Sequence, residues 1–436
     1  MKILVAGAGH GGLAAAALLA KDGHSVTVFE KNTRGSVGYD WEDRFTFSLL
    51  SDITKKDIPE SEWRYRGDCA FVSPDYKTKV VIKYTPENRQ KIMGRKYIIR
   101  SLIEYAEACG VEFCFNAAVQ APIIEDSAVK GLIVDGKEYR GDLVIDAAGV
   151  FSPVRSNLPA EFGIEKMPSR GDVFYACRVY FDRASSDKIS DIPFEVYLCH
   201  NGEQGLSWFC ENDDSVDILI GRIDPPTASD MAENIADFRR RHPVTGDKIQ
   251  LGGSGIIPVR RPLSLMIARG YAAVGDSAFM TTPMNGMGLD LSLKAGVLLA
   301  EKLKKSRSAD IDTLWSYNRD YHRLYGGETA KNESLKNALL NLPEGGVDFL
   351  FANGVIQASD LAGAGRNTNL GALLGKFIRG MKNPPFFFAI LGGIIKGGKL
   401  SKAFCAAPEK YDPAAVQNWQ NSVDRARLPV TRKPEK

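Results

Sequence analysis

The first thirty residues constrain the fold more than any other part of the chain. Residues 2–6 form a short apolar run, residues 12–21 are rich in alanine, and residues 25–29 form a second apolar run. This pattern predicts a buried strand, a helix and a second buried strand. A glycine-rich turn, GAGHGG, joins the first strand to the helix. We therefore expect a parallel β-α-β unit, the building block of a doubly wound α/β sheet.

The glycines of this turn have the G-x-G-x-x-G spacing that accommodates the pyrophosphate of a dinucleotide. Gly7 allows the tight turn, Gly9 lets the phosphates approach the backbone, and Gly12 lets the helix pack closely on the strand. The helix N-terminus then presents free N–H groups to the phosphates. Glu30 ends the second strand, where a carboxylate accepts hydrogen bonds from a ribose diol. The alternative is a glycine-rich turn in an ordinary β-α-β unit.

Length and composition exclude several other classes of protein. A chain of 436 residues exceeds what one core usually holds, so two or three structural units are expected. The net charge of +3 argues against a nucleic-acid binder, and no apolar run reaches the roughly 18 residues of a membrane span. The seven cysteines and five histidines are scattered, so no metal site is expected. Without an apolar leader or a disulfide pattern, a cytoplasmic location is expected.

Three later stretches extend the nucleotide-binding pattern. Residues 94–113 have the helical spacing of an amphipathic helix, which Gly110 ends before a further strand. Residues 141–158 contain a buried strand that runs into a turn of small residues. Residues 269–303 contain a strand, a turn with the pair Gly275-Asp276, a loop PMNGMG and a long helix.

In this order, the four stretches resemble the flavoprotein superfamily that includes para-hydroxybenzoate hydroxylase, and within it they are most similar to the geranylgeranyl reductase family. The resemblance covers about residues 1–325 and implies bound FAD. It implies that FAD is contacted by Gly7, Gly9, Gly11, Gly12, Glu30, Lys31, Arg95, Val119, Ala148, Gly149, Gly275, Asp276, Pro283, Gly286, Met287 and Gly288.

The resemblance also implies roles for several of these residues. Arg95 contacts the dinucleotide, and the Asp276 carboxylate accepts a hydrogen bond from the ribityl chain. The alternative role for Asp276 is that of an ordinary helix N-cap. The loop from Pro283 to Gly288 runs under the isoalloxazine ring, where glycines let backbone N–H groups approach. Ala148 stands where hydroxylases often have an aspartate.

A second unit is expected between these stretches. Short runs of alternating apolar and polar residues in 161–257, with an earlier hairpin in 68–93, predict an antiparallel sheet of about four to six strands. The resemblance implies that this sheet covers the flavin and forms the substrate cavity. Its candidate lining residues are Trp41, Tyr197, Trp208 and Phe209, with a plain core position as the alternative for Trp208.

The reaction is predicted from the neighbourhood of the Gly275-Asp276 pair. Phe279 stands where aromatic hydroxylases commonly have a histidine, and PMNGMG is similar to the reductase form of the loop. This favours reduction of a carbon–carbon double bond in an unsaturated, isoprenoid or lipid-like substrate. The alternatives are an FAD-dependent monooxygenase and a flavoprotein that passes electrons to a protein partner. The electron donor is NAD(P)H or a reduced protein.

No catalytic residue is assigned from the sequence. The candidate proton donors are Tyr197, Cys199, His200 and Cys210, each with a structural role as the alternative. The acidic run 40–44 either positions a substrate amine, tunes the proton supply or is a solvated loop. It lies in a stretch that lacks the cysteine of many geranylgeranyl reductases.

The last hundred residues predict a helical cap. From residue 376 onward there are 12 Lys and Arg against 4 Asp and Glu, a net charge of +8. The cap either packs on the FAD-binding unit or contacts an anionic membrane or lipid. The predicted units are therefore 1–67, 94–160 and 258–325 for FAD, 68–93 and 161–257 for the substrate sheet, and 326–436 for the cap.

Overall fold

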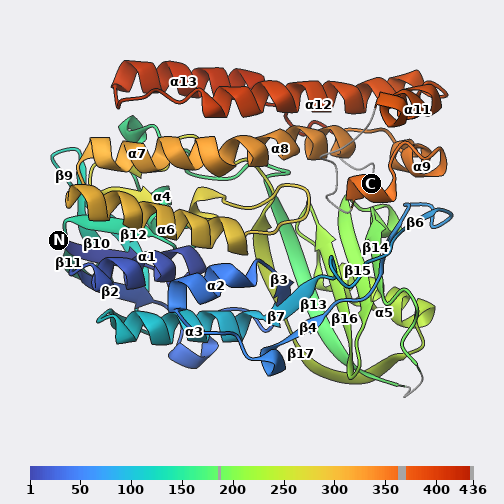
Figure 1. Ribbon diagram of the computed structural model, residues 1–436, viewed down its shortest axis with the longest axis horizontal. Helices are drawn as coiled ribbons and strands as arrows, with labels where there is room; N and C mark the ends of the chain where they lie inside the picture. Colours follow the sequence, from blue (N-terminus) through green and yellow to red (C-terminus); the bar gives the residue numbers. More distant parts are fainter. Residues whose placement is uncertain (185–187, 362–369, 433–436) are drawn as a thin grey trace.

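The computed structural model describes residues 1–184, 188–361 and 370–432 (Figure 1). One unit is built on a six-stranded sheet, parallel except for one edge strand. The strand order is β18 (Ile267–Ala268), β19 (Tyr271–Ala273), β12 (Leu143–Asp146), β1 (Lys2–Ala6), β2 (Ser25–Glu30) and β8 (Glu112–Phe115). The strands β1, β12 and β19 are almost wholly buried, as a parallel sheet covered on both faces requires.

Helices and a small sheet cover this parallel sheet. The helices around it are α1 (His10–Lys21), α2 (Phe47–Thr54), α3 (Arg95–Ala108), α4 (Pro153–Ser156) and α6 (Leu289–Ser306). The small sheet contains β9 (Val119–Glu125), β10 (Ala128–Val134) and β11 (Lys137–Arg140), and β10 contacts β1 and β12. Its two hairpin turns have positive φ at residues 126–127 and 135–136, as type I′ turns require.

A seven-stranded sheet forms the second unit (Figure 1). Its order is β17 (Thr245–Pro258), β13 (Val173–Arg183), β16 (Ser215–Arg222), β15 (Gly205–Glu211), β14 (Phe194–Leu198), β5 (Cys69–Val72) and β6 (Lys79–Ile82). The sheet has more strands than expected, and β14 pairs with β5 in parallel. The reason is that the early hairpin β5–β6 docks beside a strand from much later in the chain. Helix α5 (Ala228–Arg241) packs on β16.

A three-stranded sheet completes the strands of the described residues. It orders β3 (Glu42–Arg44), β7 (Lys91–Gly94) and β4 (Trp63–Tyr65). β7 leads directly into α3, so this small sheet holds the chain just before Arg95.

The C-terminal part is helical, as predicted. The helices are α7 (Ile311–Tyr321), α8 (Gly327–Leu340), α9 (Gly346–Ala352), α10 (Ala358–Leu361), α11 (Leu370–Gly380), α12 (Pro384–Cys405) and α13 (Pro413–Ala426). Figure 1 shows α12 and α13 as an outer layer over α7 and α8. Leu400, Phe404 and Trp419 belong to the same core as β1 and α1. Among the described residues, no helix combines the length and apolar character needed to cross a membrane.

The predicted fold class is confirmed: a Rossmann-like unit, an inserted sheet and a helical C-terminal region. The predicted residue boundaries of the three units stay a prediction.

Candidate FAD and substrate site

The glycines of the first turn pack against the turn that follows β12. A Cβ on Gly7 would lie 2.7 Å from the Ala147 carbonyl oxygen, and a Cβ on Gly9 would lie 2.9 Å from the same oxygen. A Cβ on Gly12 would lie 2.5 Å from the Ala147 Cβ, and one on Gly11 would lie 2.5 Å from the Ser292 carbonyl oxygen of α6. Real side chains do not approach so closely, so only glycine fits this loop. Three segments that are distant in the sequence meet here: the glycine loop, the turn at Ala147 and the start of α6 at Ser292. We call the glycine loop, with these contacts, the cradle for a dinucleotide.

Glu30 lies at the end of β2 beside this cradle. Its side chain is buried, with Oε2 accepting a hydrogen bond from the Ala8 amide at 2.8 Å and Oε1 accepting one from the Asn32 amide at 2.9 Å. The carboxylate is thereby oriented where the ribose diol was predicted. Lys31 follows it and is exposed, and Val119 begins β9 and is half-buried.

In the turn after β12, Asp146 stabilises the turn through hydrogen bonds. Asp146 is buried and accepts hydrogen bonds from Ser152 Oγ at 2.6 Å, Tyr271 Oη at 2.9 Å and the Ala148 amide at 3.1 Å. These bonds fix the turn in which Gly149 has a φ of +87°. Ala148 and Gly149 are half-buried, and they follow the Ala147 residue that contacts the glycine cradle.

At the flavin end, an acid and an arginine lie near each other. Burial raises the pKa of Asp276 to about 6, and the positive charge of Arg95 opposes this rise. Arg95, at the start of α3, forms an ion pair with Asp43 and lies 5.4 Å from the Trp41 ring centroid. Gly275 has a φ of +67°, which sets the turn before Asp276.

The structure adds His10 and Asp43, which sequence reasoning did not assign. Burial lowers the pKa of His10 to about 3, and the charge of Arg95 lowers it further. The His10 Nε2 atom is buried without a hydrogen-bond partner among the described residues. His10 stands inside the glycine motif and Asp43 inside the acidic run 40–44, so both positions carried a signal. An orphaned ring nitrogen in the cradle fits a site that a polar ligand completes.

The loop from Pro283 to Gly288 is held by its own hydrogen bonds. Thr282 donates its amide to the Met287 carbonyl at 2.9 Å, and the Met287 amide donates to Asn285 Oδ1 at 3.2 Å. Gly286 has a φ of +67°, and a Cβ there would lie 3.0 Å from Ile257 Cγ2. The whole loop lines a cavity, and α6 begins immediately after it.

That cavity has a volume of about 710 Å³ and lies between the loop, the seven-stranded sheet and helices α8 and α9. The volume is typical of a small-molecule site. Most of its lining is apolar. The apolar lining residues include Phe71, Ile82, Phe174, Phe194, Val196, Leu198, Leu206, Trp208, Leu219, Ile223, Ile257, Val259, Leu339, Leu340, Val347, Phe351, Ile356 and Leu361.

Two of the four predicted substrate residues line the cavity and two do not. Trp41 and Trp208 are in the lining. Tyr197 and Phe209 lie on the other face of the sheet, so their prediction as lining residues is corrected. Tyr197 packs 5.1 Å from the Phe238 ring of α5, and Phe209 stacks on His242 at 3.7 Å. The physical reason is the twofold alternation of a strand, which turns Trp208 inward and its neighbour outward.

The other predicted proton donors lie in different surroundings. Cys199 lines the cavity, and burial raises the pKa of its thiol. His200 is buried and bonded to Asp237 at 3.1 Å, and burial lowers its pKa to about 4. Cys210 lines a second pocket, and burial raises its pKa to about 11. His200 and Cys210 therefore have structural surroundings.

Two buried cationic side chains at the cavity, Arg178 and Lys336, belong to no motif that the sequence analysis identified. Arg178 pairs with Asp217 through bonds of 2.8 and 2.6 Å, and Trp208 Nε1 donates to the same carboxylate at 3.3 Å. Lys336 of α8 donates to the Val259 carbonyl at 2.6 Å and to the Gly171 carbonyl. Burial lowers the pKa of Lys336 to about 8. No local pattern predicts the two cation contacts, because Arg178 and Asp217 are 39 residues apart and Lys336 and Val259 are 77 apart.

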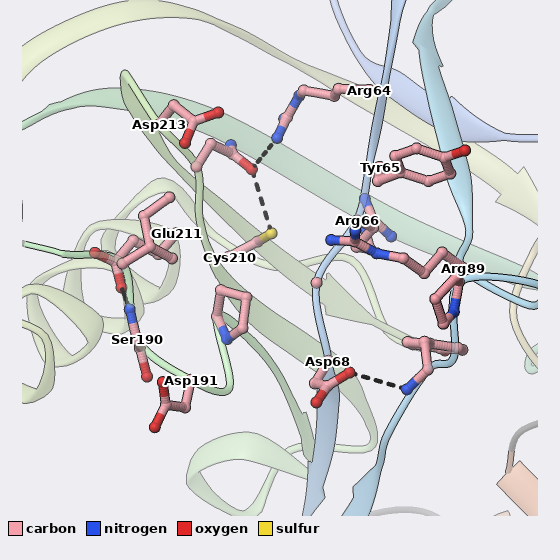
Figure 2. A pocket seen from close by; sticks show the side chains of 16 residues that line it. Arg64, Tyr65, Arg66, Asp68, Arg89, Ser190, Asp191, Cys210, Glu211 and Asp213 are labelled. Carbon is pink, nitrogen blue, oxygen red and sulfur yellow. Dashed lines mark hydrogen bonds between the residues drawn. The ribbon is translucent and has the colours of Figure 1, made fainter.

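Figure 2 shows the second pocket, of about 490 Å³, which is more polar. Arg64 donates to Asn212 Oδ1 at 2.6 Å, and Asp68 accepts from the Tyr84 amide at 2.9 Å. Arg66 and Tyr84 line both this pocket and the cavity. The polar pocket therefore adjoins the apolar cavity.

Comparison with known proteins agrees with this geometry. The sequence profile of the FAD binding domain family matches residues 1–233, so the chain belongs to that family and is an FAD-dependent oxidoreductase. It is 22% identical to a digeranylgeranylglycerophospholipid reductase of Sulfolobus acidocaldarius, over 97% of this chain and 96% of the relative. The predicted resemblance to geranylgeranyl reductases and the predicted FAD cofactor are thereby confirmed.

Two solved structures show the same fold. A geranylgeranyl bacteriochlorophyll reductase-like protein of Thermoplasma acidophilum has a TM-score of 0.73 at 18% identity, covering 90% of this chain and 99% of its own. A probable FAD-dependent monooxygenase of Pseudomonas aeruginosa has a TM-score of 0.55 at 18% identity, covering 78% of this chain and 96% of its own. The individual FAD contacts, the cytoplasmic location and the partners stay predictions.

Proposed function

We propose that this protein reduces carbon–carbon double bonds in an isoprenoid-like lipid. The observation that carries the proposal is the apolar cavity, one wall of which is the loop 283–288 where the flavin ring is expected. An extended hydrocarbon chain suits such a lining, because burial of apolar surface is favourable at roughly 25 cal/mol per Å². The relative from Sulfolobus, named as a reductase of a digeranylgeranyl phospholipid, supports this substrate class.

The residues present suit FAD. The glycine cradle and the N-terminus of α1 would hold the pyrophosphate, Glu30 the ribose, and Asp276 the ribityl chain. When bound, FAD supplies hydride-transfer chemistry. The chain's own contribution is to orient the lipid and to exclude water, for which Trp208, fixed by Asp217, forms a rigid wall.

Saturating a double bond also requires a proton, and Lys336 is our candidate source. Its side chain lines the cavity and is buried, and two backbone carbonyls orient its Nζ. A pKa of about 8 keeps Nζ mostly protonated at neutral pH and able to release a proton. The rate of substrate reduction should fall as the pH rises through about 8. Lys336→Arg, whose guanidinium does not release its proton, should lower the rate of reduction and remove that fall, whereas Lys83→Arg on the surface should leave both unchanged.

The test of the function is an anaerobic single turnover. The enzyme's flavin is reduced with dithionite, a geranylgeranyl lipid is added, and the flavin spectrum is followed before oxygen is admitted. We expect reoxidation without oxygen and a product heavier by two hydrogens. A flavin that stays reduced until oxygen enters, with a product heavier by one oxygen atom, would make the protein a monooxygenase. Reoxidation by protein electron carriers alone would make it an electron-transfer flavoprotein.

The physiological electron donor is predicted to be NAD(P)H or a reduced protein. The two are separated by replacing dithionite with each donor under the same anaerobic conditions. NAD(P)H that bleaches the flavin at a rate sufficient for turnover would identify the nicotinamide as the donor. Bleaching only by a reduced carrier protein would identify a protein partner.

A further inference from the structure

Exposed apolar side chains gather on two helices of the C-terminal layer. Of the fourteen large hydrophobic residues exposed in the described chain, six come from α11 and α12 or the turn between them. They are Phe377, Ile378, Met381, Phe388, Ile394 and Ile395. We call them, with the lysines described below, the α11–α12 face. Figure 1 shows α12 in the outermost layer, with α11 at its end.

The packing of α12 within the chain does not account for this face. On its inner side, a Cβ on Gly393 would lie 2.5 Å from Ala338 Cβ, and one on Gly397 would lie 2.6 Å from the Lys331 carbonyl oxygen. These close approaches press α12 onto α8. In contrast, Ile395 is 52% exposed and Phe388 is 51% exposed. Apolar side chains clustered in this way on a surface indicate an interaction site.

The charge of this region is of one sign. Residues 376–405 contain six Lys and Arg and no Asp or Glu. Lys396, Lys399 and Lys402 are all exposed and follow at intervals of three directly after Ile395. Residues three apart are neighbours on a helix, so these lysines form a row beside the apolar side chains.

We propose that the α11–α12 face docks on an anionic lipid bilayer. A helix that exposes apolar side chains beside a row of lysines can insert the former at the headgroup boundary and place the latter against lipid phosphates. Docking lays α12 along the surface, since no described helix is able to cross a membrane. A second copy of the chain fits less well, because a symmetric contact would bring like charges together.

This docking would bring the bilayer close to the cavity. Phe386, Phe387 and Ile390 of α12 pack in one cluster with Leu350 of α9. On α9, Val347 and Phe351 line the cavity. A single helix therefore separates the docking face from the proposed lipid site. The bilayer proposal goes beyond the reaction proposed above and does not depend on it.

The experiment is co-sedimentation of the full chain, as holoenzyme, with sucrose-loaded vesicles. The vesicles are phosphatidylcholine alone or phosphatidylcholine with phosphatidylglycerol. We expect the protein to pellet with the anionic vesicles at low salt and to be released at high salt. Lys396→Ala with Lys399→Ala should weaken binding roughly thirtyfold, at about 1 kcal/mol for each lysine. Phe388→Glu with Ile395→Glu should abolish it.

Matched controls keep the test independent of folding and of activity. Ile249→Glu changes an apolar residue of β17 that is 61% exposed, and Lys137→Ala removes an exposed lysine of β11; both should bind like the wild type. Every variant should retain its flavin and its melting temperature. Three results would overturn the proposal: wild-type protein that stays in the supernatant with anionic vesicles, equal losses in the controls, or a dimer in solution that Phe388→Glu dissociates.

Discussion

The FAD cradle has no room for even one additional carbon atom at Gly9. A Cβ there would lie 2.9 Å from the Ala147 carbonyl oxygen, which belongs to rigid backbone. We therefore predict that Gly9→Ala purifies with much less FAD, with affinity reduced at least about tenfold, a cost of roughly 1.4 kcal/mol. The measurement is the ratio of flavin to protein absorbance. Gly35→Ala is the control, because nothing lies within 4 Å of a Cβ at that site; equal flavin in both variants would contradict the cradle.

Buried histidines make the stability of the protein sensitive to acid. Burial lowers the pKa of His322 to about 4, and its Nε2 bonds to the Ser264 carbonyl at 2.7 Å. Below its ordinary pKa of about 6.5 the unfolded chain takes up a proton that the folded chain does not, so stability falls with falling pH until about pH 4. His322 alone contributes a loss of roughly 2 kcal/mol between about pH 7 and pH 5.

His322→Gln tests this pH dependence, because glutamine can still donate to the Ser264 carbonyl. Its melting temperature should decline less steeply with acidification than that of the wild type. The comparison uses the slope, since the substitution also alters the contact of His322 with Phe404, whose ring centroid lies 4.9 Å away. His24→Gln, at a half-buried position before β2, should flatten the slope less, because partial burial lowers the pKa of His24 by a smaller amount. A slope unchanged by His322→Gln would contradict the assignment.

Neighbouring side chains of β15 point to opposite faces of the sheet, so one contributes to the cavity and the next to the core. Trp208 faces the cavity and Phe209 faces α5. Trp208→Ala should raise the KM for the lipid, because the cavity loses a wall. Phe209→Ala should instead lower stability by roughly 3–5 kcal/mol, because a core ring is removed. Urea unfolding and steady-state kinetics measured on both variants check this; a Phe209→Ala enzyme with altered KM and normal stability would reverse the assignment of faces.

The elements that sequence predicted well are those specified locally. β1, α1 and β2 follow from an apolar run, a glycine turn and Glu30, all within thirty residues. The parallel docking of β5 on β14 was missed, because strand pairing between distant segments leaves no local pattern. Tyr197 was assigned to the wrong face since alternation predicts two faces without showing which one is covered. The burial of Lys336 at the cavity was not predicted, because its partner Val259 lies far away in the sequence.

On the scale of the whole molecule, buried ion pairs join the units. Arg260 is fully buried and binds Glu165 through bonds of 2.6 and 2.7 Å, and Asp172 at 3.2 Å. Asp172 in turn pairs with Arg427 from the C-terminal region. Arg260→Ala should lower the free energy of unfolding by roughly 3–5 kcal/mol, because the buried Asp172 carboxylate and the half-buried Glu165 carboxylate both lose a partner.

Arg140→Ala is the matched control for the Arg260 prediction. Arg140 pairs with Glu125 on the surface, and removing such a pair costs less than about 1 kcal/mol. Urea denaturation followed by circular dichroism compares the two variants. Similar losses in both would show that the buried network does not join the units.

The glycine cradle also determines when, during synthesis of the chain, the FAD site can be completed. Gly7 is among the first residues made, but the residues that press on this loop are Ala147 and, on α6, Ser292. A ribosome adds about 5–20 residues per second, so the loop and the apolar strand before it wait roughly 15–60 seconds for their last partner. Until Ser292 has emerged, the nascent chain displays an unfinished sheet edge and lacks a complete pocket for its flavin. Loading of the cofactor is therefore a late event in the life of each new molecule, and the interval before it is when aggregation is the greatest risk.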